Sequence, residues 1–276
     1  MHPIKAILLS FVLAPVLVLA QTAPALKPTS KPAMLPPTPE QLLVIDQVRK
    51  ESAAAPAPKR DLSTGTPGKP NANFGQIQGG FLASHKSFME RKAKPIGVLF
   101  LGDSITAGWG RAPEVWKNHF GKYDPANFGI SGDRTQHILW RIDQGELDGI
   151  SPKVVVLMIG TNNGGSYTAD QIAAAVTKIV TTVHAKLPET KVLLLAIFPR
   201  AEKADNPVRV KLQQVNAAIS KLDDGKQTRY LEIWKQFLAD DGTLTKEIMP
   251  DFLHPNAKGY QIWAESMQPL LDEMMK

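Results

Sequence analysis

The sequence predicts a single α/β domain built on a parallel sheet with helices on both faces. Five short apolar segments, rich in leucine and β-branched residues, alternate with longer segments in which apolar residues recur at helical spacing. Continuous apolar runs are typical of strands that are covered on both faces, and the alternation favours parallel neighbours joined by right-handed crossovers. Residues 71–276, which hold all five segments, are long enough for one domain with a sizeable core.

The first strand is expected at residues 96–101, where an apolar run stops at Gly102 and is followed by Asp103 and Ser104. The loop after the carboxyl end of such a strand is where open α/β sheets bind their ligands, so Ser104 stands where a nucleophile would act. Four further strands are expected at residues 126–130, 153–160, 191–198 and 229–234.

Capping residues and prolines mark the ends of the expected helices. Thr168 and Gln171 form a capping box before a stripe of aliphatic side chains, and Pro188 ends that helix. Further helices are expected at residues 81–94, 206–225 and from about residue 256 onward.

The first 70 residues are expected to lie outside this domain. Residues 1–20 combine Lys5, an apolar stretch and small residues before Gln21, which predicts a signal peptide, a secreted or periplasmic protein and no stable membrane insertion after cleavage. Residues 21–70 hold ten of the 22 prolines and are expected to be a largely disordered linker, although residues 39–54 carry a partial helical stripe.

Composition excludes several classes of protein. The formal net charge is +6, but no basic segment is interleaved with aromatic residues, so nucleic acid is not an expected partner. The chain has no cysteine, and its six histidines show no metal-ligand spacing, so neither a metal nor another cofactor is expected. The loop after the first strand lacks both the Gly-x-Gly-x-x-Gly and the Walker patterns, which argues against a nucleotide-binding protein of the same fold class.

Polar residues near the expected strand ends supply the groups that ester hydrolysis needs. Asp251 precedes His254 by three residues, a spacing that lets the carboxylate orient the ring so that its other nitrogen faces Ser104. Gly132 can present its backbone N–H and Asn162 its side-chain amide, and with the Ser104 N–H they would form an oxyanion hole. An Asp-x-x-His pattern alone would indicate only a salt bridge or helix cap, but the combination predicts a serine hydrolase.

In order along the chain, these residues resemble the four blocks of the SGNH (GDSL-type) hydrolase superfamily, which here are Gly102-Asp103-Ser104, Gly132, Gly160-x-Asn162 and Asp251-x-x-His254. Residues 128–147 and 160–163 look most similar to the branch that contains the catalytic subunits of platelet-activating factor acetylhydrolase. The resemblance covers about residues 95–259. It implies a three-layer flavodoxin-like fold with strand order 2-1-3-4-5, and metal-free hydrolysis of short acyl esters by Ser104, His254 and Asp251 with Gly132 and Asn162 in the oxyanion hole.

Two residues depart from the pattern of these relatives. Asn163 stands where much of the superfamily has aspartate, although the acetylhydrolase branch also has asparagine, and Ser131 replaces a glycine common in that branch. The first difference concerns loop structure more than chemistry. The second affects how the loop presents Gly132.

The expected function is that of a secreted serine esterase that hydrolyses short-chain acyl esters, with acetyl as the expected acyl group. We expect carbohydrate O-acetyl groups to be the substrates, because exported members of the superfamily that this chain resembles often remove them. Two alternatives are a lipase, lysophospholipase or thioesterase of the same fold, and a non-catalytic glycan-binding module. The presence of every catalytic residue type argues against the second alternative.

Other conspicuous residues are expected to be structural. His137 follows Asp133 closely, but its place among apolar helix residues is typical of a capping or supporting histidine. His85 has no acid partner in a fixed turn, and Asp103 is expected to hold the serine loop by accepting hydrogen bonds. Side chains that would suit either an acyl pocket or the core are Trp109, Phe198, Met249, Phe252 and Leu253.

Overall fold

The computed structural model describes residues 80–276. The predicted signal peptide at residues 1–20, the linker at 21–70 and the helical stripe at 39–54 lie outside the described residues. Within the described part, no helix is both long and apolar enough to cross a membrane.

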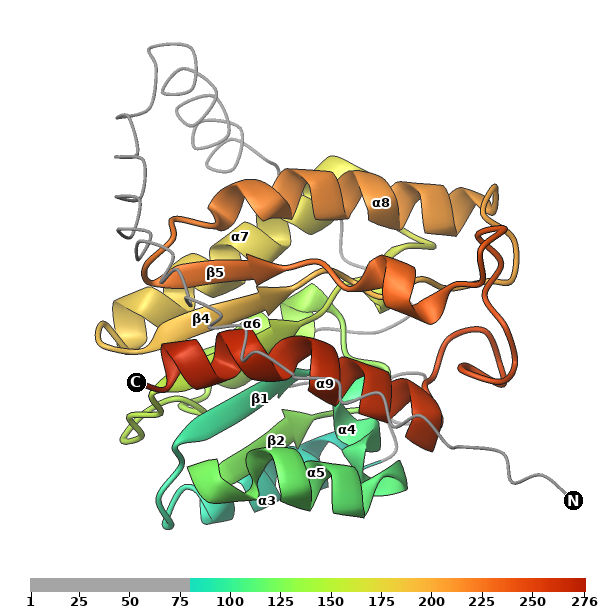
Figure 1. Ribbon diagram of the computed structural model, residues 1–276. Helices are drawn as coiled ribbons and strands as arrows, with labels where there is room; N and C mark the ends of the chain where they lie inside the picture. Colours follow the sequence, from blue (N-terminus) through green and yellow to red (C-terminus); the bar gives the residue numbers. More distant parts are fainter. Residues whose placement is uncertain (1–79) are drawn as a thin grey trace, which may run out of the picture. The chain divides into compact units, whose positions relative to one another are not determined.

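Five parallel strands form the sheet in the order β2-β1-β3-β4-β5, as predicted (Figure 1). Two of the inner strands, β1 and β3, are buried along their whole length, because helices cover both of their faces. The strands are β1 Val98–Gly102, β2 Pro125–Gly129, β3 Val154–Met158, β4 Lys191–Leu195 and β5 Thr228–Leu231.

Most strands are shorter than the apolar runs that predict them, and β4 shows why. Its predicted run extends to Phe198, but β4 ends at Leu195. The N–H and C=O of Ile197 pair with the side-chain amide of Asn216, at 2.8 and 2.9 Å, instead of with a neighbouring strand. The segment therefore stays buried after it has left the sheet.

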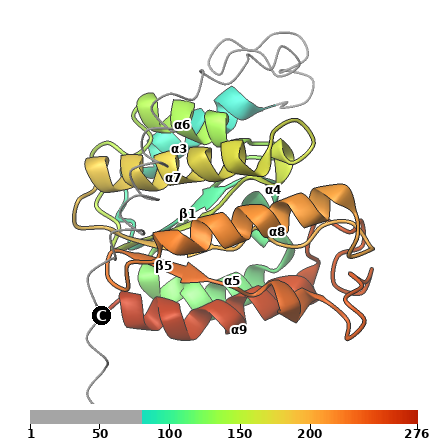
Figure 2. The same cartoon turned by 90° about the horizontal axis from the view of Figure 1, so that it is seen from above.

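Two layers of helices cover the sheet (Figures 1 and 2). Alternate strand residues face opposite layers: Leu99 and Leu101 pack with the first layer, and Val98 and Phe100 with the second. The first layer comprises α3 (Phe81–Arg91), α6 (Thr135–Asp143), α7 (Ala169–Lys186) and α8 (Pro207–Ile219), and the second α5 (Pro113–Phe120) and α9 (Ala257–Met274). The three-layer α/β architecture is confirmed.

The predicted capping box lies at the start of α7, as expected. The side chain of Thr168 accepts the N–H of Gln171 and the side chain of Gln171 accepts the N–H of Thr168, which forms the predicted capping box of α7. The helix expected at 206–225 ends earlier, at Ile219, and a 3₁₀ turn at Ser220–Leu222 follows. The short helix α4 (Ser104–Ala107) and the helix α5 were not predicted.

The register of β1 positions the loops that follow the strands. Gly102 pairs with Gly129 on one side and with Met158 on the other, so β1, β2 and β3 end at the same level. The chain leaves β1 directly into α4, which runs close to the end of β2. A Cβ atom at Gly129 would lie 2.2 Å from the Ala107 nitrogen, so only glycine allows this approach. Ser104 consequently begins its helix at the carboxyl edge of the sheet.

Candidate active site

Ser104 is the first residue of α4 and is held by contacts on both sides of it. The buried carboxylate of Asp103 accepts the backbone N–H of Ile105 at 3.0 Å and so caps the helix, as its expected structural role requires. The hydroxyl of Tyr260, from α9, donates to the carbonyl oxygen of Ile105 at 2.6 Å. Ser104 itself is partly exposed, so its hydroxyl is accessible.

Ser104, His254 and Asp251 form a continuous hydrogen-bond chain. The Oγ of Ser104 lies 2.8 Å from Nε2 of His254, a residue 150 positions away in the sequence. Nδ1 of the same ring lies 2.6 Å from Oδ2 of Asp251. If Nδ1 donates its proton to Asp251, Nε2 is left to accept the proton of the serine hydroxyl, which is the order of groups in a nucleophile, base and orienting acid.

The turn from Asp251 to His254 is shaped by its backbone as well as by its side chains. Oδ1 of Asp251 accepts the backbone N–H groups of Leu253 and His254, at 3.1 and 2.7 Å. Phe252 has a φ of 56°, in the left-handed region that non-glycine residues rarely adopt. The tight turn brings the carboxylate of Asp251 and the imidazole of His254 together on the same side of the turn.

Hydrogen bonding and burial give the two acidic residues of this region opposite pKa shifts. Partial burial raises the pKa of Asp251, but the hydrogen bonds from the side chain and backbone of His254 outweigh it, so this pKa lies below its ordinary value. Burial raises the pKa of Asp103 to about 7, against the lowering effects of the Ile105 hydrogen bond and the charge of Arg200. Asp251 is thus held ionised, whereas Asp103 exchanges a proton near neutral pH.

Gly132 and Asn162 lie in two adjoining loops that follow β2 and β3. Asn162 donates from Nδ2 to the carbonyl oxygen of Asp133, the residue after Gly132, at 2.9 Å. The buried Asn163 joins the same loops, because its Oδ1 accepts the N–H of Thr135 at 3.1 Å and its Nδ2 donates to the Thr135 hydroxyl at 3.1 Å. Asn163 is therefore a connector between the loops, which agrees with the structural effect expected of this position.

A buried arginine that the sequence analysis missed braces the loop of Gly132. Arg141, on α6, donates from Nε to Oδ2 of Asp133 at 3.0 Å and from Nη2 to the carbonyl oxygen of Phe128 at 3.1 Å. Its Nη1 also pairs with the carboxylate of Glu146. Because a buried guanidinium needs counter-charges, Asp133 is fixed beside Gly132.

Among the described residues, the histidines other than His254 have structural partners. His137 is fully buried and its Nδ1 accepts the backbone N–H of Arg134 at 3.0 Å, so it caps α6 as expected. Burial lowers the pKa of His137 to about 3, which keeps its ring neutral. His85 has no acid partner in a local turn, but its Nδ1 contacts the buried Glu146 at 3.0 Å, a long-range partner 61 residues away.

The candidate acyl-pocket residues divide between core and surface. Trp109, Phe198 and Met249 are buried in the core, whereas Phe252 and Leu253 are partly exposed beside His254. Among the described residues, no group of three or more His, Asp or Glu side chains could hold a metal ion.

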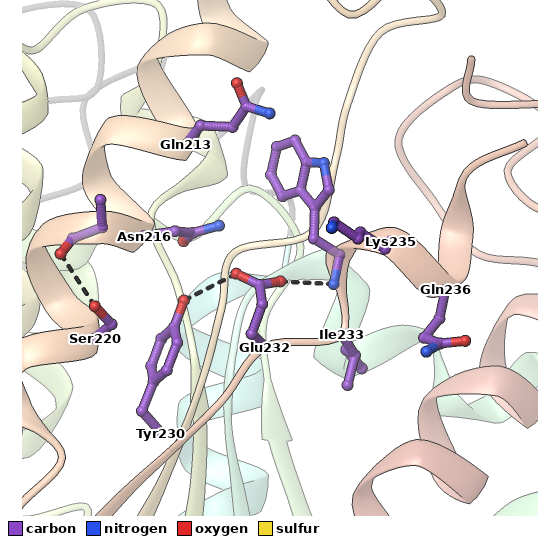
Figure 3. A pocket seen from close by; sticks show the side chains of 10 residues that line it. Gln213, Asn216, Ser220, Tyr230, Glu232, Ile233, Lys235 and Gln236 are labelled. Carbon is purple, nitrogen blue, oxygen red and sulfur yellow. Dashed lines mark hydrogen bonds between the residues drawn. The ribbon is translucent and has the colours of Figure 1, made fainter. Parts of the chain in front are cut away.

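A cavity of about 560 Å³ lies elsewhere, between α8 and the chain that leaves β5 (Figure 3). None of the candidate site residues lines it. The Tyr230 hydroxyl donates to Glu232 at 3.1 Å, the other carboxylate oxygen of Glu232 accepts the N–H of Trp234, and both polar atoms of Asn216 pair with Ile197. Tyr230, Glu232 and Asn216 are thus engaged within the protein, and we assign no ligand to the cavity.

Comparisons with known proteins identify relatives for most of the described chain. A model of the GDSL-like Lipase/Acylhydrolase family matches residues 100–262. Platelet-activating factor acetylhydrolase IB subunit alpha1 of Homo sapiens is 36% identical over 198 residues, covering 71% of this chain and 84% of the relative. Platelet-activating factor acetylhydrolase IB subunit alpha2 of Rattus norvegicus is 35% identical over 198 residues, covering 71% of this chain and 85% of the relative. A solved GDSL-like lipase from Bacteroides thetaiotaomicron has the same fold, with a TM-score of 0.57, 22% identity, and 69% of this chain and 98% of that chain covered.

These relatives contradict the predicted secreted or periplasmic location. The acetylhydrolase IB subunits are intracellular, whereas the prediction depended on residues 1–20 alone, which lie outside the described residues. A lysine followed by an apolar stretch and small residues is a short compositional signal. It is outweighed here by a match across more than two thirds of the chain.

The buried carboxyl of Asp103 predicts a pH-dependent stability. Its pKa rises from 3.8 in the unfolded chain to about 7 in the folded protein, so the folded state retains a proton that the unfolded state has lost. The resulting stabilisation is fully present below about pH 4 and is lost as the pH rises through about 7. Asp103→Asn keeps an acceptor for the Ile105 N–H but cannot titrate. The variant should therefore gain unfolding free energy relative to the original protein between about pH 5 and pH 7, by at most about 1.4 kcal/mol per pH unit.

Urea denaturation of both proteins across this pH range measures the difference. Parallel stability profiles for the two proteins would contradict the assignment.

Proposed function

This chain belongs to the GDSL-like Lipase/Acylhydrolase family, and we propose that it hydrolyses short-chain acyl esters, above all acetyl esters, with Ser104 as nucleophile, His254 as general base and Asp251 as orienting acid. The family and the acetylhydrolase relatives establish an ester-bond hydrolase. The observation that carries the assignment of residues is the hydrogen-bond chain of 2.8 and 2.6 Å from Ser104 through His254 to Asp251.

In the proposed reaction, Nε2 of His254 takes the proton of the Ser104 hydroxyl as Oγ attacks the ester carbonyl carbon. The tetrahedral intermediate then collapses, and the alcohol leaves with the proton from His254. Water attacks the acyl-serine in the same way, with His254 again as base, and releases the carboxylic acid and free serine. The ionised Asp251 stabilises the imidazolium that forms in each half of the reaction.

The developing oxyanion would accept hydrogen bonds from the backbone N–H groups of Ser104 and Gly132 and from the side chain of Asn162. The amide of Asn162 has two N–H bonds, and one of them donates to the Asp133 carbonyl. This bond orients the amide plane and leaves the second N–H for the substrate. A donor fixed before the reaction needs no reorganisation in the transition state.

Exposure of the site supports a bulky, hydrated alcohol half, and we propose carbohydrate O-acetyl groups as substrates. The side chain of Asp251 is 56% exposed and that of His254 is 24% exposed, so the base and the acid lie near the protein surface. An acetyl group can reach Ser104 there while a sugar stays in water. The relatives are named for platelet-activating factor, so a phospholipid-like ester is the competing substrate class.

Replacement of the nucleophile tests the proposal directly. Ser104→Ala is expected to abolish turnover of p-nitrophenyl acetate and covalent labelling by a fluorophosphonate, because both need the serine oxygen. Ser87→Ala, an exposed serine on α3, is the matched control and should behave like the original protein. EDTA should leave the rate unchanged. Turnover or labelling that persists in Ser104→Ala would exclude this nucleophile.

Replacement of the acid tests the role of the turn. Asp251→Asn can still accept the backbone N–H groups of Leu253 and His254, so the fold should be kept, but the imidazole loses its charged partner and its tautomer. A large fall in kcat is expected, toward the ~10⁴ found for the equivalent acid of a serine protease. Asp241→Asn removes the charge of another exposed aspartate that accepts a backbone N–H, and should leave kcat unchanged. Equal kcat values for the two variants would show that Asp251 has no part in the reaction.

Substrate preference is tested by varying the two halves of the ester separately. A p-nitrophenyl series from acetyl to octanoyl is expected to show the highest kcat/KM for acetyl. Acetate release from acetylated xylan is expected to exceed that from platelet-activating factor at equal ester concentration. Faster cleavage of octanoyl esters would indicate a lipase, and a preference for platelet-activating factor would replace the sugar with a phospholipid-like alcohol.

A further inference from the structure

Arg200 lies on the loop after β4 and contacts the loop that carries Asn162. Its Nη1 donates to the carbonyl oxygen of Thr161 at 3.0 Å and lies 3.4 Å from the Thr161 hydroxyl. This carbonyl belongs to the peptide unit that joins Thr161 to Asn162. A fixed carbonyl fixes the plane of that peptide. The guanidinium therefore controls the point from which the Asn162 side chain projects.

The residue after Arg200 is bonded to the turn of Asp251 and His254. The N–H of Ala201 donates to the carbonyl oxygen of Phe252 at 2.8 Å. Ala201 has a φ of 65° and Phe252 a φ of 56°, so two left-handed non-glycine residues are joined by one hydrogen bond. Such conformations persist only where the surroundings hold them. The loop of Arg200 and the turn are thus braced against each other.

The charge of Arg200 lies within reach of two carboxylates of the site. Burial lowers the pKa of the Arg200 guanidinium, and the attraction of Asp103 and Asp251 opposes this effect. Asp103 directly precedes the nucleophile, and Asp251 orients the base. Arg200 is only partly exposed, so water screens these attractions less than it would at the surface.

We propose that Arg200 is a positioning residue that holds the Asn162 loop and the Asp251–His254 turn in one arrangement. The inference rests on the oxyanion hole and triad proposed above, and adds a group that touches neither the acyl carbon nor the reacting proton. Its effect is on the alignment of Asn162 with the tetrahedral intermediate. Loss of Arg200 should therefore slow the chemical step and leave binding of a neutral ester unchanged.

Arg200→Met keeps the length of the side chain and removes its charge and donors. A fall in kcat of about 10- to 100-fold with KM changed less than about twofold is expected on p-nitrophenyl acetate, the range produced by small misplacements of catalytic groups. Arg200→Lys should recover only part of kcat, because a lysine is a point charge without the planar fork of donors. Millimolar guanidinium, below denaturing concentrations, should raise kcat of Arg200→Ala and have no such effect on Ser104→Ala.

The matched control is Arg229→Met. Arg229 pairs with Glu273 at 3.2 Å and with Asp223 at 3.8 Å, and lies on the edge strand β5. This variant removes a partly exposed arginine with two carboxylate partners, and kcat should not change. Urea denaturation of all variants identifies any that fail to fold, in which case Arg200→Lys and guanidinium rescue decide the outcome.

Two results would overturn the inference. One is an unchanged kcat in folded Arg200→Met. The other is a rise in KM alone, which would make Arg200 a substrate-binding group. Ser104→Ala in the same series separates this outcome from failure of the proposed function. If Ser104→Ala is inactive and the Arg200 variants are not impaired, only the role of Arg200 is wrong. If Ser104→Ala retains turnover, the triad itself is wrong.

Discussion

The register of β1 against its two neighbours is the constraint on which the geometry of the site depends. Gly102 pairs with Gly129 and Met158, so three strand ends stop at one level and three loops start side by side. A Cβ at Gly102 would lie 2.1 Å from the Thr106 hydroxyl and 2.5 Å from the Met158 carbonyl oxygen. Without a side chain at this position the chain can turn at once into α4. A shift of one residue would invert the faces of the strand and move Ser104 away from the loops of Gly132 and Asn162.

Buried charge supplies the second constraint, and it acts on the loops rather than on the strands. Arg141 is fully buried, and it is compensated by the carboxylates of Asp133 and Glu146 and by the Phe128 carbonyl. Desolvation makes such a group costly, and loss of one partner would leave an uncompensated charge in a medium of low dielectric constant. The loop of Gly132 is therefore tied to α6 by an interaction that tolerates little displacement. Asn162 in turn ties the loop after β3 to the loop of Gly132, because its side chain donates to the Asp133 carbonyl.

Features that depend on neighbouring residues in the sequence could be predicted from local sequence patterns. The apolar runs predicted the five strands, the capping box predicted the start of α7, and the three-residue spacing predicted contact between Asp251 and His254. Pairs separated by tens of residues leave no such periodic signal. Glu146 contacts His85 across 61 positions, and Arg200 contacts Thr161 across 39, so neither was found. A Pro at the first position of α5, Pro113, is a local signal that could have identified that helix.

The site spans a steep gradient of solvent exposure, and this decides which forces act at each residue. Asp103 is 1% exposed, so its charge is strongly affected by burial, whereas the side chain of Asp251 is 56% exposed and its charge is screened by water. Screening weakens the long-range field of Asp251 but has less effect on its short hydrogen bonds. The three hydrogen bonds that Asp251 accepts, from the ring of His254 and from the N–H groups of Leu253 and His254, therefore matter more than its long-range field. A surface-exposed acid can orient a base in this way only if the turn that carries it is rigid, and the left-handed Phe252, bonded through its carbonyl to Ala201, provides that rigidity.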